Sequence, residues 1–133
     1  MIIREYTGYD ASEILPLYQS VGWIAYTAQP EVLRAGFENS LLCLGAYEGN
    51  ELIGLVRVVG DGCTVVLLQD ILVHPAHQRQ GVGTGLVKTA LDRFKDVRQV
   101  QLVTDDQPDT LAFYRSLGFR DLGSLGCRGF MRG

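Results

Sequence analysis

The chain has 133 residues, of which 47% are apolar, and a formal net charge of −3. This length predicts one domain, spanning residues 1–133, with a full hydrophobic core. The acidic balance and the lack of a Lys/Arg cluster argue against a nucleic-acid partner, and no apolar run approaches the ~20 residues of a membrane span. The three cysteines are odd in number and far apart, which favours a reduced compartment and argues against a metal site. The first residues lack signal-peptide features, which favours a cytoplasmic location.

The first half of the chain begins with a short strand over residues 1–6 and a helix that runs to about Val21. Asp10 has the capping-box spacing to a glutamate three residues later, which predicts a helix start there. Pro16 would then fall inside the helix, whereas a cap at Ser12 would place it in the first turn, where proline is tolerated. The sequence leaves both starts open.

Residues 22–27 concentrate aromatic side chains and are predicted to form a loop, and residues 30–38 suggest a second short helix. Residues 41–47 and 52–59 flank a turn-forming segment and predict an antiparallel hairpin. Residues 64–73 are apolar enough for a central strand.

The second half continues with a glycine-rich loop at residues 78–85 and a helix whose apolar residues recur at 3.6-residue spacing. Residues 100–104 alternate as a further strand. Pro108 suits a first helical position and Gly118 suits the residue after a helix end, which predicts a helix to about Leu117. One or two short strands are expected from Phe119 onward. The order predicts a mixed α/β sheet flanked by about four helices.

The loop at residues 78–85, with the sequence QRQGVGTG, joins the central strand to this helix. Its glycines remove the side chains that would keep a ligand from the backbone, and the helix start directs free N–H groups and a positive dipole end into the same space. No Asp or Glu occurs from Ile71 to Leu91, while Arg79 and Lys88 do. The segment therefore predicts a pyrophosphate-binding loop.

Two better-known phosphate loops do not fit. A Walker loop has lysine before Ser/Thr, whereas Gly83 precedes Thr84, and a dinucleotide fingerprint has its third glycine where Leu86 stands. The pattern Gln-x-x-Gly-x-Gly resembles motif A of the GNAT superfamily, the acyl-coenzyme-A-dependent N-acyltransferases. The resemblance implies that the cofactor is held by the strand end and the loop. These positions are Ile71, Leu72, Val73, Gln78, Arg79, Gln80, Gly81, Val82, Gly83 and Thr84.

Residues 111–119, with the sequence LAFYRSLGF, resemble a second signature of the same family. The resemblance implies that Tyr114 protonates the departing coenzyme A thiolate, and a phenol, with a pKa near 10, is suited to this role. The alternative is a half-buried helix aromatic beside Phe113. The family often has a cofactor-binding asparagine at the position of Gln107, whose longer amide is the corresponding candidate.

Other site residues keep two interpretations. Asp70 is a carboxylate within an apolar strand, so it is either paired, in a structural role, or in a cleft where a raised pKa would suit a base that accepts an amine proton. Many relatives place a glutamate at the position of Gln69, so the base is either Asp70 or a chain of water molecules. Trp23 and Tyr26 either pack in the core or line the acceptor pocket.

The resemblance implies a GNAT-fold N-acetyltransferase that moves the acetyl group of acetyl-coenzyme A directly to a primary amine of a small molecule or peptide. Direct transfer is favoured because no cysteine lies in either signature. The alternative is a non-catalytic acyl-coenzyme-A sensor on the same fold. Family members of this size are often homodimers. The identity of the acceptor cannot be read from the sequence.

Overall fold

The computed structural model describes all residues from Met1 to Gly133, and the chain divides into two compact units, Met1–Val103 and Thr104–Gly133. The first unit holds one five-stranded sheet with the strand order β1-β2-β3-β4-β5. Its strands are β1 (Ile2–Glu5), β2 (Leu42–Glu48), β3 (Glu51–Gly60), β4 (Val65–Val73) and β5 (Gln99–Leu102).

The sheet is mixed, as the sequence predicted. Strands β1 to β4 pair antiparallel in succession, whereas β5 pairs parallel with β4. A parallel neighbour requires a crossover connection, and α4 (Val82–Arg93) supplies it. The predicted hairpin and the predicted central strand are both confirmed.

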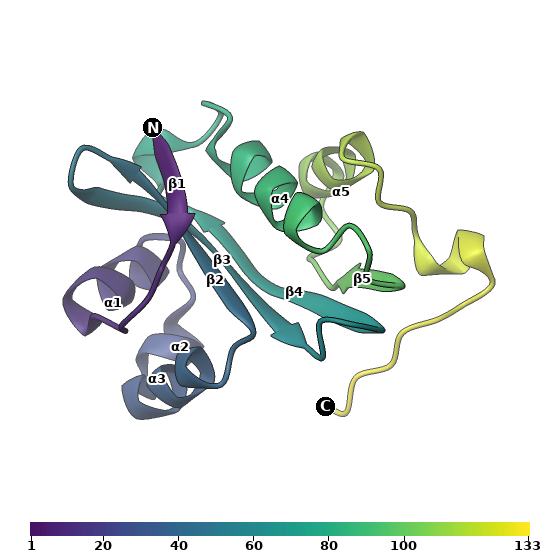
Figure 1. Cartoon of the computed structure of the whole chain (residues 1–133), viewed down its shortest axis with the longest axis horizontal. Coiled ribbons are helices and arrows are strands. Elements are labelled where there is room, and N and C mark those ends of the chain that lie inside the picture. Colours follow the sequence, from purple (N-terminus) through teal and green to yellow (C-terminus); the bar gives the residue numbers. More distant parts are fainter. The chain divides into compact units, whose positions relative to one another are not determined.

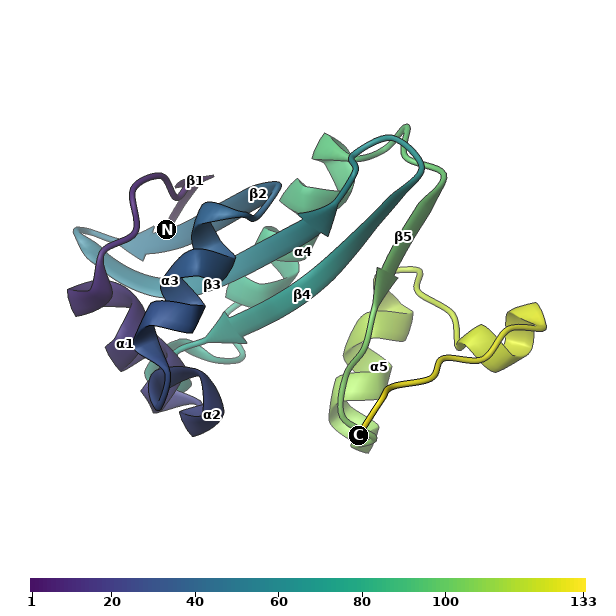
Figure 2. The same ribbon diagram turned by 90° about the horizontal axis from the view of Figure 1, so that it is seen from below.

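Helices cover both faces of this sheet. Figure 1 shows α1 (Ala11–Ser20), α2 (Ile24–Thr27) and α3 (Pro30–Glu38) on one side and α4 on the other, and Figure 2 shows the same layers from below. On the α4 side, a Cβ added to Gly54 of β3 would lie 2.9 Å from Val82 Cγ1. The bare backbone at Gly54 therefore lets the start of α4 approach the sheet closely.

Two details of the N-terminal helices differ from the expectation. Asp10 is the N-cap of α1, since its carboxylate accepts a hydrogen bond from the Ser12 N–H, so the start at Ser12 is wrong and Pro16 lies inside the helix. The predicted loop at residues 22–27 contains α2, a single helical turn. Four residues are too few to show the 3.6-residue spacing of apolar side chains by which a helix is recognised in a sequence.

The second unit contains α5 (Pro108–Ser116) and a short 3₁₀ helix at Leu122–Leu125. Gly118 follows α5 with a φ of +93°, which confirms the predicted glycine-assisted helix end. The strands expected from Phe119 onward are absent, so that prediction is wrong. Glycines at 123, 126 and 129 disfavour extended pairing, and Phe130 is left 93% exposed. No helix of the chain is both long and apolar enough to cross a lipid bilayer.

Candidate functional site

The loop before α4 has an unusual backbone. Arg79 has a φ of +63° and is the only non-glycine residue in the left-handed region, and Gly81, the N-cap of α4, has a φ of +82°. A non-glycine residue in this region costs about 1–2 kcal/mol, so the surrounding structure must hold it there. Left-handed residues within a turn direct successive N–H groups toward one side and form an anion-binding concavity.

The N–H groups of residues 79–84 donate to no acceptor within the protein; the first α4 N–H to do so is that of Gly85, which donates to the Gly81 carbonyl. No side chain caps the helix and no acidic residue lies in its first turn. The resulting set of free donors and the positive end of the helix dipole favour an anion of the size of a phosphate group.

The segment between β4 and this loop is fixed by local hydrogen bonds. His74 Nδ1 accepts from the Ala76 N–H at 3.1 Å and caps the 3₁₀ helix Pro75–His77, while Gln78 Nε2 donates to the Val73 carbonyl at 3.0 Å. His74 therefore has a structural partner. No group of three or more His, Cys, Asp or Glu residues is arranged to hold a metal ion.

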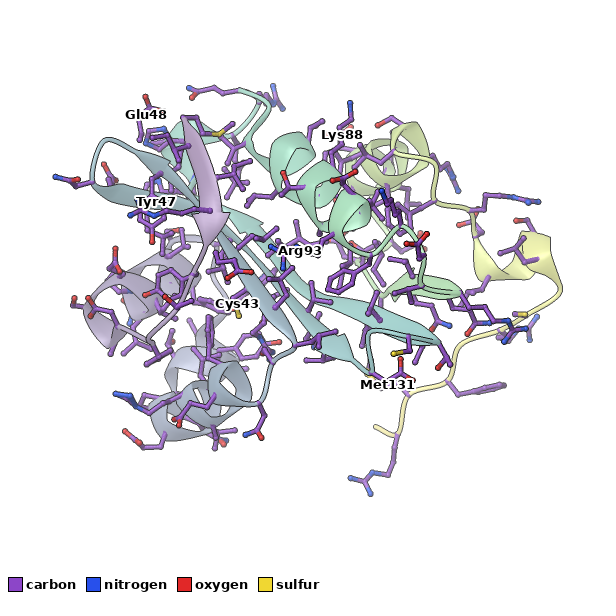
Figure 3. All side chains as sticks on the ribbon, viewed as in Figure 1. Cys43, Tyr47, Glu48, Lys88, Arg93 and Met131 are labelled. Atoms are coloured by element: carbon purple, nitrogen blue, oxygen red, sulfur yellow. The ribbon has the colours of Figure 1, made fainter.

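The charge of the loop and helix agrees with anion binding. Arg79 and Lys88 are both exposed, and Lys88 is labelled on α4 in Figure 3. With no carboxylate in the sequence from Ile71 to Leu91, the only formal charges of this segment are positive.

One edge of β4 is open beside the loop. The pairing with β5 covers only residues 65–68 of β4, and Figure 2 shows the two strands diverging beyond it. The His74 N–H donates to the Ile53 carbonyl, so by strand alternation Leu72 also turns its backbone toward β3, whereas Ile71 and Val73 turn theirs toward the open edge. Of the three residues predicted here, Ile71 and Val73 offer backbone groups to a ligand, less the Val73 carbonyl that Gln78 occupies.

Gly85, which ends the glycine-rich loop, has a packing role. A Cβ at this position would lie 2.9 Å from Ile3 Cδ1 of β1. The absence of a side chain at Gly85, like that at Gly54, sets how closely α4 lies on the sheet, and thereby where the free N–H groups stand relative to β4.

Asp70 faces the helices α1 to α3 because β4 contains a bulge. Val58 pairs with Leu68 but Arg57 pairs with Asp70, which leaves Gln69 as an extra residue in β4. A bulge of this kind reverses the faces of the side chains that follow it. Asp70 and Leu72 therefore point toward the α1–α3 layer. Before the bulge, Leu68 points to the opposite face of the sheet.

The Asp70 carboxylate is 1% exposed and fully paired. Oδ2 accepts from Arg57 Nε at 2.7 Å and from the Tyr18 hydroxyl at 2.9 Å, and Oδ1 accepts from the Tyr26 hydroxyl at 2.7 Å. Arg57, 7% exposed, also donates through Nη1 to Ser40 Oγ at 3.3 Å. The structure confirms that Asp70 is paired. Whether Asp70 also acts as a base stays a prediction.

Trp23 and Tyr26 belong to an aromatic cluster around Tyr18. Their ring centroids lie 5.9 Å and 5.3 Å from that of Tyr18, in edge-to-face arrangements. Both side chains are half-buried rather than buried. Core packing is thus observed for both residues, and a role in lining the acceptor pocket stays a prediction.

In the second unit, Tyr114 lies between Phe113 and Phe119, with ring centroids 4.9 Å and 5.9 Å away. Burial, and next the negative charge of Asp105, raise the pKa of Tyr114 to about 12. At this helix end, Arg115 and Ser116 make the side-chain hydrogen bonds. The Tyr114 hydroxyl makes no hydrogen bond with the protein. Gln107 is the exposed N-cap residue of α5 and makes no side-chain capping bond.

Two partners of Asp70, namely Arg57 and Tyr18, were not predicted from the sequence. They lie 13 and 52 residues away along the chain, so no local spacing connects them. A signal for Arg57 was present, because apart from Glu51 at the first position it is the one charged residue of the apolar strand β3, just as Asp70 is in β4. Two opposite charges in neighbouring apolar strands predict an ion pair, since an unpaired charge would be costly to bury.

Comparisons with known proteins agree with this geometry. A family model described as the acetyltransferase (GNAT) family matches residues 9–119. The solved structure of a GNAT-family acetyltransferase from Streptococcus pneumoniae is 39% identical, covers 98% of this chain and 96% of its own, and superposes with a TM-score of 0.89.

Two curated relatives are longer proteins. An uncharacterised N-acetyltransferase of Prochlorococcus marinus is 31% identical, and a histone acetyltransferase of Glycine max is 32% identical, each over 83% of this chain. The chain spans 62% and 52% of their respective lengths. A family match of this extent, together with the close likeness to the pneumococcal structure, shows that the chain belongs to the GNAT family of acetyltransferases.

Proposed function

We propose that this chain is an N-acetyltransferase that moves the acetyl group of acetyl-coenzyme A directly to a primary amine of a small molecule or peptide. The observation that carries the proposal is the row of unpartnered N–H groups at residues 79–84, at the end of a strand whose edge is open. Every helix start leaves some N–H groups free, but here no side chain caps α4, no acidic residue lies in its first turn, and the preceding loop residues add further free donors.

The two features divide the cofactor between them. The N–H groups of residues 79–84 would donate hydrogen bonds to the pyrophosphate oxygens, with Arg79 adding positive charge. The free backbone groups of Ile71 and Val73 would pair with the amide groups of the pantetheine arm as a neighbouring strand does. We further propose that the exposed amide of Gln107 contacts the cofactor.

The transfer forms one bond and breaks another. The amine nitrogen donates its electron pair to the thioester carbonyl carbon, and the carbon–sulfur bond breaks with its electron pair going to sulfur. The amine then loses one proton and the thiolate gains one. We assign the second transfer to Tyr114, whose pKa of about 12 keeps the phenol protonated and whose hydroxyl has no competing protein partner.

The acceptor side is assigned to the α1–α3 layer, where Trp23 and Tyr26 are half-buried and Asp70 lies behind them. A nitrogen acceptor is supported by the curated relatives, one named an N-acetyltransferase and the other a histone acetyltransferase. We expect a cytoplasmic location. The oligomeric state is open, and analytical ultracentrifugation would distinguish a monomer from the homodimer that is common among family members of this size.

The test is thiol release. The purified chain is incubated with acetyl-coenzyme A and a panel of amines that includes spermidine, benzylamine and a lysine-containing peptide, and free coenzyme A is measured. Amine-dependent release with one acetylated product per thiol supports the proposal. Tight acetyl-coenzyme A binding by calorimetry without release for any amine would replace the enzyme with the sensor alternative.

A further inference from the structure

Asp70 is enclosed by three side chains from three different elements. Arg57 comes from β3, Tyr18 from α1 and Tyr26 from α2, and together they supply every hydrogen bond that the carboxylate accepts. With 1% of its surface exposed, Asp70 has no direct path to a substrate. Any exchange of protons between Asp70 and the outside must pass through one of these three partners.

Only Tyr26 offers such a path. Tyr18 is fully buried, and Arg57 is buried and stays charged. Tyr26 is half-buried, and the exposed side chain of Gln69 donates through Nε2 to the Tyr26 hydroxyl at 3.4 Å. The hydroxyl thus lies between the buried carboxylate and an exposed side chain.

The position of Gln69 connects this hydroxyl to the open edge of β4. Pairing of β4 with β5 ends at Leu68, so Gln69 is the first residue of β4 without a partner in β5. It is also the bulged residue that turns Asp70 toward Tyr26. The Tyr26 hydroxyl therefore stands where the open edge begins.

The hydrogen-bond arithmetic fixes what Tyr26 can do there. A phenol has one proton to donate, and Tyr26 donates it to Asp70 Oδ1 at 2.7 Å. Its remaining capacity, toward Gln69 and the open edge, is as an acceptor. Burial, and next the hydrogen bond to Asp70, raise the pKa of Tyr26, so the phenol stays protonated and oriented.

We propose that Tyr26 is the residue that receives the proton of the acceptor amine, with Asp70 as the positioning residue that takes the Tyr26 proton in turn. The step balances: an amine N–H bond breaks and a bond to Tyr26 Oη forms, while the original Tyr26 O–H proton moves to Asp70 Oδ1. The phenol ends neutral, as it began. The inference rests on the proposed acetyl transfer and names its proton acceptor.

The other groups around Asp70 suit this role. The charged Arg57 side chain donates to Oδ2, the oxygen that does not take part in the proton transfer, and the Tyr18 hydroxyl donates to the same oxygen. Cys43, on β2, is the remaining titratable neighbour, and burial raises the pKa of its thiol so that it stays neutral. Proton transfer is thereby confined to Oδ1 and Tyr26.

The first experiment compares Tyr26→Phe with Tyr18→Phe. Both remove one hydroxyl that donates to Asp70, but only Tyr26 faces the open edge. We expect Tyr26→Phe to lower kcat for acetylation of the responding amine by about 10²-fold or more and to leave acetyl-coenzyme A affinity unchanged, the usual loss for a positioned acid or base. Tyr18→Phe, checked for folding by circular dichroism, should lower kcat by only a few-fold. Equal losses in the two variants would overturn the relay.

The second experiment adds Asp70→Asn and the double variant Tyr26→Phe/Asp70→Asn. Residues that act as one unit are not additive, so the double variant should be no slower than the slower single one. The kcat/KM profile of Asp70→Asn should rise more steeply with pH than that of wild type, because hydroxide can take the amine proton at high pH and partly replace the missing acceptor. Multiplicative losses with an unchanged pH profile would overturn the inference.

A measurement without turnover separates this inference from the proposed function. In protein labelled with ¹³C at tyrosine Cζ, the Tyr26 resonance is identified by its loss in Tyr26→Phe. It should shift in Asp70→Asn and again when spermidine or benzylamine is added to the coenzyme-A-loaded protein. A resonance that responds to neither overturns the role of Tyr26 even if thiol is released. A response without thiol release supports Tyr26 as the amine contact while the proposed function fails.

Discussion

The two sides of the sheet treat their polar groups in opposite ways. On the α1–α3 side, the buried Asp70 carboxylate has three protein donors and Arg57 lies directly against it. On the α4 side, the N–H groups of residues 79–84 have no protein acceptor. Both arrangements belong to the same unit and flank the same strand.

The difference separates polar groups that the fold itself pairs from polar groups that it leaves free. A buried charge must be paired within the fold, because leaving it alone would cost several kcal/mol. Exposed N–H groups at a helix start are solvated by water, so leaving them free costs little and keeps them available. Folding therefore completes the first arrangement but not the second.

The largest expected effect concerns a third polar group, the unpartnered hydroxyl of Tyr114. Tyr114→Phe should lower kcat by about 10²–10⁴-fold, the usual contribution of a general acid, with acetyl-coenzyme A affinity and unfolding free energy nearly unchanged. Steady-state thiol release and denaturant unfolding measure both. Full activity on a substrate whose chemistry is rate-limiting would leave the thiolate to be protonated by solvent.

The pKa of Tyr114 adds a pH test. Because burial raises this pKa from 10 to about 12, the folded state holds the proton more tightly than the unfolded chain. The stabilising contribution is complete below pH 10 and is lost as the pH rises toward 12. Wild type should lose more stability over this interval than Tyr114→Phe, and equal losses would contradict the shift.

The second effect breaks the paired side of the comparison. Arg57→Leu leaves Asp70 buried without its cation, and the expected loss of unfolding free energy is about 3–5 kcal/mol. Arg93→Leu is the matched control, since Arg93 pairs with Glu5 at 2.9 Å but the two side chains are 49% and 50% exposed. An exposed pair contributes about 1 kcal/mol or less. Similar losses in the two variants, by urea unfolding, would deny Arg57 its structural role.

The third effect concerns the free N–H groups at the start of α4. Gly83→Asp places a carboxylate at the start of α4, where the phosphate would bind, and should weaken coenzyme A binding by about 10²-fold or more while the fold is kept. Thr89→Asp, later on the same helix and exposed, should retain most of the affinity. Calorimetry measures both, and undiminished binding by a folded Gly83→Asp protein would remove the loop from the cofactor site.

The smallest effect concerns the strained residue of the loop. Arg79→Gly relieves a left-handed conformation worth about 1–2 kcal/mol, against which the greater freedom of glycine in the unfolded chain costs about 0.5–1 kcal/mol. We expect unfolding free energy to stay level or rise by up to about 1 kcal/mol, and coenzyme A affinity to fall a few-fold and become less salt-dependent. A clear destabilisation would mean that the arginine side chain, rather than the site, holds the loop.

The sequence predicted those parts of the fold that local chemistry determines. The hairpin, the start of α5 at Pro108 and the turn at Gly118 follow from side-chain and backbone preferences within a few residues, whereas for α1 the sequence left the starts at Asp10 and Ser12 both open. The one-turn helix α2 is too short for a period, and residues 119–133 were assigned strands that have no partner. Strand pairing is decided by tertiary contacts, which a local pattern does not contain.

The site divides in the same way. The loop at residues 78–85 could be identified because its chemistry is contained in adjacent residues. The pairing of Asp70 with Tyr18 could not, because a single bulged residue, Gln69, decides which face Asp70 takes. For Arg57 the sequence offers only the signal of two opposite charges in neighbouring apolar strands. Strict alternation would have placed Asp70 on the same side as Leu68, away from the partners that it has.

Because of the Gln69 bulge, the two ends of β4 also have different neighbours. Before it, β4 pairs with β5; after it, that backbone edge is unpaired, and the side chains of Asp70 and Leu72 face the layer of α1, α2 and α3. Substitutions in that layer can therefore reshape the proposed acceptor side while the backbone that faces the glycine loop keeps its place. In an evolving lineage, such a strand would let the choice of acceptor diverge independently of the cofactor.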